Sequence, residues 1–274
     1  MLMLRSIAVR LIMGLTDEEK YFFDLLGFAI LRDVLPAEQV ARCNEAIDEH
    51  AHLLAPHERR LEGDSRTLTS PVRQHWMSGL LGWERPWCEP FRDLLVHPRI
   101  DPYLKELQGD GYRINQGPEI VTMEKGCAGH YLHGGGVERP DFTQTYRYNH
   151  GRMYCGMTVV EFMLADEGPG DGGVAIVPGG HKSNYPIPQS FSYYEEHQEL
   201  VQEIHVKAGD AVIFTEACTH GTLPWNASHQ RRTLIYRYTP GSIAFGKDGV
   251  GAYPQAVIDD LTETQRAVMR PAGS

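Results

Sequence analysis

Two histidines far apart in the chain, His133 and His220, are the residues best suited by type and context to bind a metal ion. Each follows an extended, strand-like segment and is followed by glycine, in His133-Gly134-Gly135 and His220-Gly221. Iron sites often combine two such histidines with one carboxylate, in the pattern His-x-Asp/Glu and a distant second histidine. Gly135 stands at the carboxylate position of that pattern. The chemistry therefore depends on what replaces the carboxylate.

Most of the 13 histidines are expected to be surface or hydrogen-bonded residues. Only His197 has an acidic residue two positions further on, Glu199. This pair lies in a charged segment, residues 193–201, whose composition is typical of a solvated helix. His197 also lies only 23 residues before His220, and so short a segment could hardly cross a barrel to bring the two histidines together. We therefore interpret His197 and Glu199 as surface residues rather than ligands.

Arg231 begins the last strong strand-like segment, residues 231–236, eleven residues after His220. Strand alternation places Arg231, Thr233 and Ile235 on one face. A buried arginine there could bind the distal carboxylate of 2-oxoglutarate through two parallel hydrogen bonds, which lysine cannot reproduce. Spacing alone leaves open a second interpretation, in which His220 is a hydrogen-bonded core histidine and Arg231 a surface charge.

The elements that must position these residues change along the chain. The first third has helical patterns, beginning with a capping-box-like segment at residues 16–19, and residues 56–90 are expected to form a loop or lid. After Gly111, short strand-like runs alternate with Gly and Pro, among them residues 153–164 and 211–215. Helices followed by many short strands predict a mainly β fold with a helical buttress. The expected architecture is a double-stranded β-helix, the jelly roll of cupin-like proteins.

No composition shift, internal repeat or low-complexity tract divides the sequence, so we expect a single domain over residues 1–274. Residues 1–15 are expected to include a disordered tail or a start placed too early, with Met13 as the true initiator. A targeting peptide is the alternative interpretation of this apolar segment.

Bulk properties favour a cytoplasmic protein with small-molecule partners. The net charge of −10 argues against a nucleic-acid partner and against attraction to a membrane surface. No segment approaches the length of a membrane span. The five cysteines are odd in number and form no Cys-x-x-Cys pair, which is typical of free thiols in a reducing compartment.

Over most of its length the sequence resembles the phytanoyl-CoA dioxygenase family. The similarity includes residues 22–31, residues 91–100, Ala208-Gly209-Asp210 and the segment from His220 to Arg231. It also includes the turn Pro178-Gly179-Gly180-His181-Lys182, where Gly180 replaces the serine of the family. The resemblance implies a double-stranded β-helix that uses Fe(II), 2-oxoglutarate and O₂.

Carried over residue by residue, the resemblance implies that His133 and His220 bind iron and that Arg231 anchors 2-oxoglutarate. His181 belongs to the conserved turn of the family and is not expected to bind iron. Arg232 is expected at the surface or behind the site. The implied activity is that of an Fe(II)/2-oxoglutarate-dependent oxygenase, either a dioxygenase or a halogenase. It would oxidise an unactivated C–H bond of a small molecule.

Gly135 is the departure from the family, which has aspartate at this position. Glycine there resembles the iron- and 2-oxoglutarate-dependent halogenases, which carry Gly or Ala. Loss of the carboxylate vacates a metal site and removes one negative charge, so chloride could bind and restore both. This predicts a chloride site beside Gly135 and chlorination of the substrate.

Two alternatives remain. In a hydroxylase, water or another carboxylate would complete the iron site. Glu161 is the best such candidate, because it interrupts an apolar run and shares a face with Met157, Val159 and Met163. The weaker candidates are Glu119, Glu124, Glu138 and Asp141. The other alternative is a non-catalytic relative that binds a ligand without turnover, although the intact His220 and Arg231 argue against it.

Two groups of residues bear on the substrate. Four aromatic side chains could line a pocket or belong to the core: Trp76, Trp83, Trp87 and Tyr131. Four arginines could bind the phosphates of coenzyme A or form salt links across the lid: Arg59, Arg60, Arg66 and Arg73. The substrate class stays open between a thioester and another small molecule.

Overall fold

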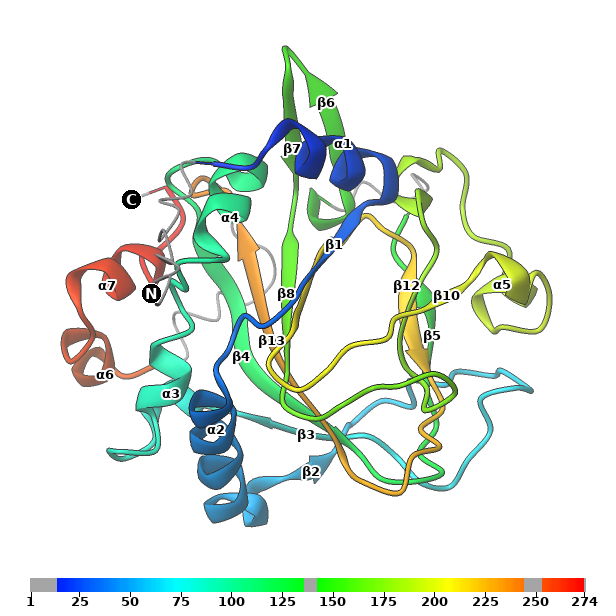
Figure 1. The fold of residues 1–274 in the computed structure, drawn as a ribbon, viewed down its shortest axis with the longest axis horizontal. Coiled ribbons are helices and arrows are strands. Elements are labelled where there is room, and N and C mark those ends of the chain that lie inside the picture. The colour runs from blue at the N-terminus through cyan, green and yellow to red at the C-terminus, as the bar shows by residue number, and fades with distance from the viewer. Residues whose placement is uncertain (1–13, 136–141, 244–252, 274) are drawn as a thin grey trace, which may run out of the picture.

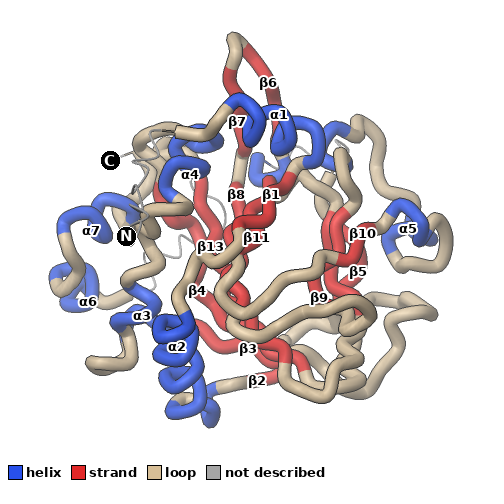
Figure 2. The backbone as a smooth tube through the Cα atoms, in the orientation of Figure 1, coloured by secondary structure: helices blue, strands red, loops and turns tan. Residues whose placement is uncertain are grey.

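Two antiparallel sheets face each other in the computed structural model, which describes residues 14–135, 142–243 and 253–273 (Figures 1 and 2). The larger sheet has seven strands, in the order β1 (Phe28–Leu31), β11 (Ala211–Thr215), β8 (Thr158–Met163), β13 (Arg231–Thr239), β4 (Arg113–Met123), β3 (His75–Ser78) and β2 (Ala55–Pro56). The smaller sheet has four strands, in the order β10 (Gln202–Glu203), β9 (Gly173–Ile176), β12 (His220–Leu223) and β5 (His130–His133). A hairpin of β6 (Tyr146–Asn149) and β7 (Arg152–Cys155) projects from the barrel.

From β4 to β13 the chain passes back and forth between the two sheets, interrupted by the β6–β7 hairpin and by the neighbouring strands β9 and β10 in the small sheet. This is the topology of a double-stranded β-helix. The predicted fold class is therefore confirmed. Two sequence expectations need correction. The run 153–164 is divided between β7 and β8 at Gly156, where a Cβ would collide with the carbonyl oxygen of Phe142 at 1.5 Å. Residues 56–90, expected as a loop, contribute β3 to the large sheet.

Most of the helices lie on the side of the large sheet that faces away from the small sheet, whereas α5 lies beside β5 of the small sheet (Figure 1). The described helices are α1 (Asp17–Leu26), α2 (Ala37–Glu49), α3 (Glu89–Arg92), α4 (Asp101–Gln108), α5 (Gln189–Ser192), α6 (Gln255–Asp259) and α7 (Glu263–Val268). The predicted start of the first helix is confirmed, because the Thr16 and Glu19 side chains cap each other's backbone N–H groups. Within the described residues, no helix combines the length and apolar character that a membrane span requires.

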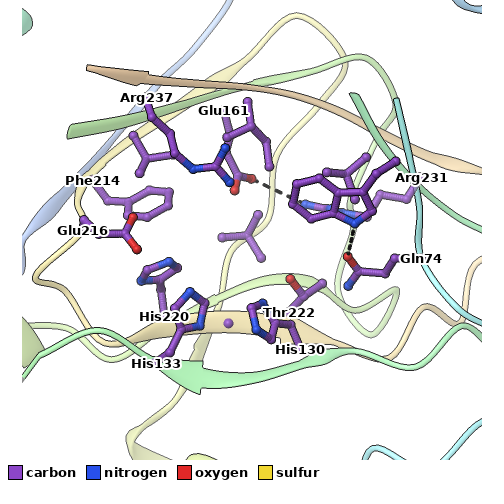
Figure 3. A pocket seen from close by; sticks show the side chains of 16 residues that line it. Gln74, His130, His133, Glu161, Phe214, Glu216, His220, Thr222, Arg231 and Arg237 are labelled. Carbon is purple, nitrogen blue, oxygen red and sulfur yellow. Dashed lines mark hydrogen bonds and ion pairs between the residues drawn. The ribbon is translucent and has the colours of Figure 1, made fainter. Parts of the chain in front are cut away.

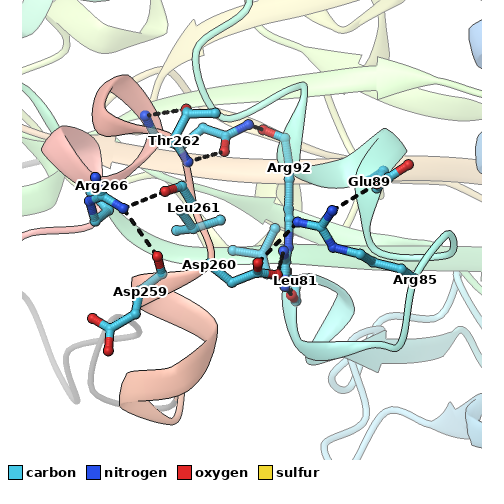
Figure 4. A network of polar contacts seen from close by, with 10 residues as sticks. Leu81, Arg85, Glu89, Arg92, Asp259, Asp260, Leu261, Thr262 and Arg266 are labelled. Atoms are coloured by element: carbon cyan, nitrogen blue, oxygen red, sulfur yellow. Dashed lines mark hydrogen bonds and ion pairs between the residues drawn. The ribbon is translucent and has the colours of Figure 1, made fainter.

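The C-terminal helices are tied to α3 by a polar network (Figure 4). The buried Arg92 guanidinium donates to the carbonyl oxygen of Leu81 and, at 2.7 Å, to the carboxylate of Asp260. Arg85 donates to the other oxygen of the same carboxylate at 3.1 Å. One aspartate between α6 and α7 therefore binds two arginines and fixes the C-terminal segment beside the helical layer.

The large sheet has a core on each face, so its central strands are buried on both sides. On β8, Val160 and Phe162 pack toward the helices, whereas Val159 and Met163 face the small sheet. By alternation Glu161 also faces the small sheet. The space between the sheets therefore receives a charged side chain from the middle of an otherwise apolar strand. All five cysteines are buried free thiols.

Candidate metal centre

One cavity between the sheets receives most of the predicted site residues (Figure 3). His133 and His220 enter it from the small sheet, at the end of β5 and the start of β12. Arg231 and Glu161 enter it from the large sheet. The two sheets thus bring together residues that lie almost a hundred positions apart in the sequence. Gly135 instead lines a different cavity, beside the β6–β7 hairpin.

The two histidines are paired residues of neighbouring strands, and their ring centroids lie 4.2 Å apart. The Nδ1 atom of His133 lies 3.1 Å from the carbonyl oxygen of Tyr131, and that of His220 lies 2.7 Å from the carbonyl oxygen of Cys218. Donation from Nδ1 to a carbonyl leaves Nε2 unprotonated and fixes the ring, as is usual for histidines that bind metal.

Both rings are held in the neutral form. Burial and, to a smaller extent, the neighbouring His220 ring lower the pKa of His133 to about 4. Burial likewise lowers the pKa of His220 to about 4, assisted by the positive charge of Arg237. At neutral pH each imidazole can therefore accept a metal ion without first losing a proton.

Glu216 is a carboxylate that the sequence analysis missed. One potential ligand atom from each of His133, Glu216 and His220 lies within 4.8 Å of the other two. Among the described residues, these three form the one group of histidine, cysteine or acidic side chains with such a spacing. Two histidines and one carboxylate form the donor set of many non-haem iron sites.

A tight turn between β11 and β12 holds Glu216. The N–H of Cys218 donates to the carbonyl oxygen of Thr215 at 2.8 Å, which closes the turn. The N–H of Glu216 donates to the carbonyl oxygen of Met157 at 3.0 Å, which fixes the turn against the start of β8. Glu216 precedes His220 by four residues, so the same short segment supplies both a carboxylate and a histidine.

The glycines after His133 allow the chain to pass close to that turn. Gly134 has φ +80°, and a Cβ there would lie 2.6 Å from the carbonyl oxygen of Cys218 and 2.7 Å from that of Glu216. Gly135 has φ +67°, and its Cβ would meet Thr219 Oγ1 at 2.9 Å and the carbonyl oxygen of Gly180 at 3.1 Å. A side chain at position 135 would thus point at Thr219 and Gly180.

Arg231 is buried, with 3% of its surface exposed, so the alternative of a surface charge is wrong. Its Nε donates to Glu167 Oε1 at 2.7 Å, and its Nη2 lies 3.5 Å from Glu161 Oε2. In Figure 3, Glu216 and the two histidines lie at one end of the cavity and Arg231 at the other. Arg232 points outward and binds Asn44 and Asp48 of α2, as expected.

Glu161 lies in the cavity but outside the group formed by the histidines and Glu216. Its Oε2 is buried and makes no hydrogen bond with the described residues. Burial raises the pKa of Glu161 to about 7, against the opposing effect of the Arg231 charge. This side chain is therefore poised between its neutral and its ionised form near neutral pH.

The other acidic candidates lie elsewhere. Glu119 binds Arg237 at 2.6 Å, and Glu124 accepts a hydrogen bond from Gln230. Glu138 and Asp141 lie outside the described residues.

His197 and His181, the two other histidines interpreted from the sequence, lie away from the metal group. His197 is exposed and lies 3.7 Å from Glu199, so the pair stays on the surface. His181 Nε2 contacts the carbonyl oxygen of Asp24 at 3.0 Å, and His181 lies in the turn where the resemblance placed it.

His130 is a second residue that the sequence analysis missed. The pairing of β5 with β12 shifts in register between His220 and Thr222, and both His130 and His133 line the cavity. Their ring centroids are 4.3 Å apart. Burial, together with the neighbouring His133, lowers the pKa of His130 well below its usual range. Simple alternation from His133 would have selected Tyr131 instead.

Of the four aromatic residues considered for a pocket, Trp76 lines the cavity. Trp83 and Trp87 pack against the helical core, and Tyr131 packs on the outer side of the small sheet. Three of the four arginines considered for phosphate binding have partners within the protein. Arg60 binds Glu62, Arg66 binds Glu195, and Arg73 binds the backbone carbonyl oxygens of residues 57–59.

Residues 23–234 match the phytanoyl-CoA dioxygenase (PhyH) family. The chain belongs to this family. Membership confirms the resemblance deduced from the sequence and the predicted enzyme class, an Fe(II)- and 2-oxoglutarate-dependent oxygenase. No curated protein sequence matches the chain.

Solved structures share the fold. HygX from Streptomyces hygroscopicus, crystallised with nickel and 2-oxoglutarate, has a TM-score of 0.68 and 23% identity, over 84% of this chain and 89% of HygX. The 2-oxoglutarate-dependent carbocyclase SnoK of nogalamycin biosynthesis has a TM-score of 0.59 and 16% identity, over 83% of this chain and 85% of SnoK. The epimerase SnoN of the same biosynthesis has a TM-score of 0.59 and 18% identity, over 89% of this chain and 86% of SnoN.

Proposed function

We propose that this family member oxidises a C–H bond of a small molecule, with Fe(II) held by His133, Glu216 and His220 and 2-oxoglutarate anchored by Arg231. The observation that carries the proposal is the group of two neutral histidines and one carboxylate at the end of the barrel cavity. Family membership supplies the enzyme class, and the arrangement of the side chains around the cavity supports the proposed roles.

The donor set fits Fe(II). Two imidazoles and one carboxylate leave a divalent iron with one net positive charge and with open positions for further ligands. The Nδ1 contacts of His133 and His220 with backbone carbonyls orient both rings. Glu216 supplies the negative charge that an aspartate at position 135 would supply in the family pattern.

Arg231 is suited to hold the far end of 2-oxoglutarate. Glu167 occupies its Nε edge and fixes the guanidinium plane, while Nη2 is turned toward Glu161 in the cavity. A guanidinium held in this way binds a carboxylate with two parallel hydrogen bonds at little further entropic cost. When bound, Fe(II) and 2-oxoglutarate activate O₂ for oxidation of a nearby C–H bond.

Five apolar side chains also line the cavity: Val121, Val159, Val174, Phe214 and Ile235. They limit the access of water to the space between the metal ligands and Arg231, which strengthens electrostatic interactions there. The substrate is proposed to be a small molecule. HygX has been crystallised with hygromycin B, and SnoN with nogalamycin RO, so two proteins of this fold bind small molecules.

Chlorination is the narrower form of this proposal, and its support is the absence of a carboxylate at Gly135. Two observations favour oxygenation instead. Glu216 provides a carboxylate at the metal group, so chloride is not needed to restore the charge. A side chain at position 135 would point toward Thr219 and Gly180. We therefore propose oxygenation as the main outcome and leave chlorination to a direct test.

The test is an anaerobic titration of the metal-free protein with Fe(II) and 2-oxoglutarate, with and without chloride, followed by the visible charge-transfer band. We expect a band that chloride does not shift. A band that shifts with chloride would make chlorination the working mechanism. The absence of any band would favour a non-catalytic ligand-binding relative and overturn the proposal.

A further inference from the structure

The cavity contains more charge than the proposed cofactors need. Arg231 and Arg237 enter it from β13, Glu161 from β8, and Glu216 from the turn after β11, while Glu167 lies behind Arg231. The facing small sheet adds no ionised group, because burial lowers the pKa of each of its three histidines: His130, His133 and His220. Glu161 is the carboxylate with no evident task in binding iron.

Glu161 lies at the edge of Arg231 that a ligand would use. Glu167 holds the Nε edge of the guanidinium at 2.7 Å, so Nη2 is directed toward the cavity. Glu161 Oε2 lies 3.5 Å from Nη2, is fully buried and makes no hydrogen bond with the described residues. The contact is too long for a hydrogen bond, so Arg231 has an anionic neighbour that it does not fully engage.

From this arrangement we infer that Glu161 competes with the distal carboxylate of 2-oxoglutarate for Arg231, and that binding of 2-oxoglutarate requires Glu161 to take up a proton. The inference rests on the proposed function. Glu167 already pairs with Arg231, so an incoming carboxylate would make ionised Glu161 a third negative group beside one buried guanidinium, which like-charge repulsion disfavours. Protonated Glu161 turns from a competitor into a donor, because its O–H can donate a hydrogen bond to the incoming carboxylate.

The local charges make the proton uptake feasible near neutral pH. Burial raises the pKa of Glu161 to about 7, with Glu167 and Glu216 acting in the same direction and the two arginines against it. An added carboxylate beside Arg231 raises the pKa further. Below pH 7 Glu161 is already mostly neutral, and 2-oxoglutarate binds without proton uptake. Above pH 7 each binding event must also take up a proton, so affinity falls by up to about tenfold per pH unit.

The experiment is isothermal titration calorimetry of the Ni(II)-loaded full-length protein with 2-oxoglutarate between pH 6 and pH 8.5, in buffers of different ionisation enthalpy. For the wild type we expect proton uptake to rise from near zero at pH 6 toward one proton at pH 8. Glu161→Gln should show almost no uptake, and its affinity should stay constant across this range. Gln keeps the shape and a hydrogen-bond donor, so its affinity at pH 8 should match that of the wild type at pH 6.

Glu119→Gln is the matched control, because Glu119 binds the other cavity arginine, Arg237, and is remote from Arg231 in the register of β13. It should retain the proton uptake of the wild type. Equal uptake in the wild type and in Glu161→Gln would overturn the inference while leaving the proposed function intact. A failure of all three proteins to bind 2-oxoglutarate at any pH would overturn both.

Discussion

Glu216 carries the negative charge of the proposed metal site at a position that no histidine-based motif would select. If it binds the metal, Glu216→Gln should weaken Fe(II) binding by about 100-fold or more, since even partners behind the ligands contribute 10- to 100-fold in known sites. The matched control is Glu161→Gln, which removes another buried carboxylate from the same cavity. Anaerobic Fe(II) titration measures both variants, and equal affinities would remove Glu216 from the site.

Arg231 and Arg232 offer a second comparison between single residues. Arg231 faces the cavity, whereas Arg232 binds Asn44 and Asp48 on the outer face of the sheet. Arg231→Lys keeps the charge but loses the planar pair of donors, so 2-oxoglutarate affinity should fall by about 10- to 100-fold. Arg232→Lys should leave it unchanged. Calorimetric titration with 2-oxoglutarate tests both, and a larger effect at Arg232 would contradict the assignment.

At the level of elements, the crossing of the His133–Gly135 segment over the turn at residues 215–218 keeps the metal ligands together. Gly134→Ala would bring a Cβ within 2.7 Å of two carbonyl oxygens of that turn and displace Glu216. We expect it to lower both the stability and the Fe(II) affinity. Gly126→Ala is the control, because Gly126 also has positive φ, +81°, but has open space around its Cβ position.

The control should lose about 1 kcal/mol of stability from backbone strain alone and keep its Fe(II) affinity. Thermal unfolding and Fe(II) titration separate the two effects. If Gly134→Ala bound Fe(II) as tightly as the wild type, the close packing of the glycine segment on the turn would not be what positions Glu216.

The sequence predicted those elements whose residues carry a local signal. The apolar run 211–215 forms β11 as expected, and Arg231 begins β13. The site residues that were missed depend on tertiary contacts. Glu216 reaches the histidines only because the turn after β11 folds beside His133, and His130 lines the cavity at a register shift of β12. The direction that a side chain would take at position 135 depends on the positive φ of Gly135. The sequence does not reveal this φ, because glycine adopts positive and negative φ about equally readily.

For the whole molecule, helices on one face of the large sheet and the small sheet on the other leave its central strands without contact with solvent. This arrangement places the cavity between two buried layers, and it makes each charge in the cavity costly for folding. Glu161 therefore links the proposed function to the stability of the entire fold.

That cost should be visible in the pH dependence of unfolding. Burial raises the pKa of Glu161 from 4.5 to about 7, so the folded protein binds this proton more tightly than the unfolded chain. The contribution of Glu161 to the free energy of unfolding should thus fall as pH rises from about 4.5 to about 7, by at most about 3 kcal/mol, and stay constant above. Glu161→Gln should lack this loss and exceed the wild type in stability at pH 8.

Urea unfolding of the metal-free proteins at several pH values measures the effect as a difference between wild type and variant. Glu119→Gln is the control, because Glu119 is more exposed and its partner is Arg237. Its stability difference from the wild type should not change between pH 5 and pH 8 in the way expected for Glu161→Gln. A constant difference for Glu161→Gln as well would mean that Glu161 keeps the same charge in the folded and the unfolded protein, and that the cavity does not favour its neutral form.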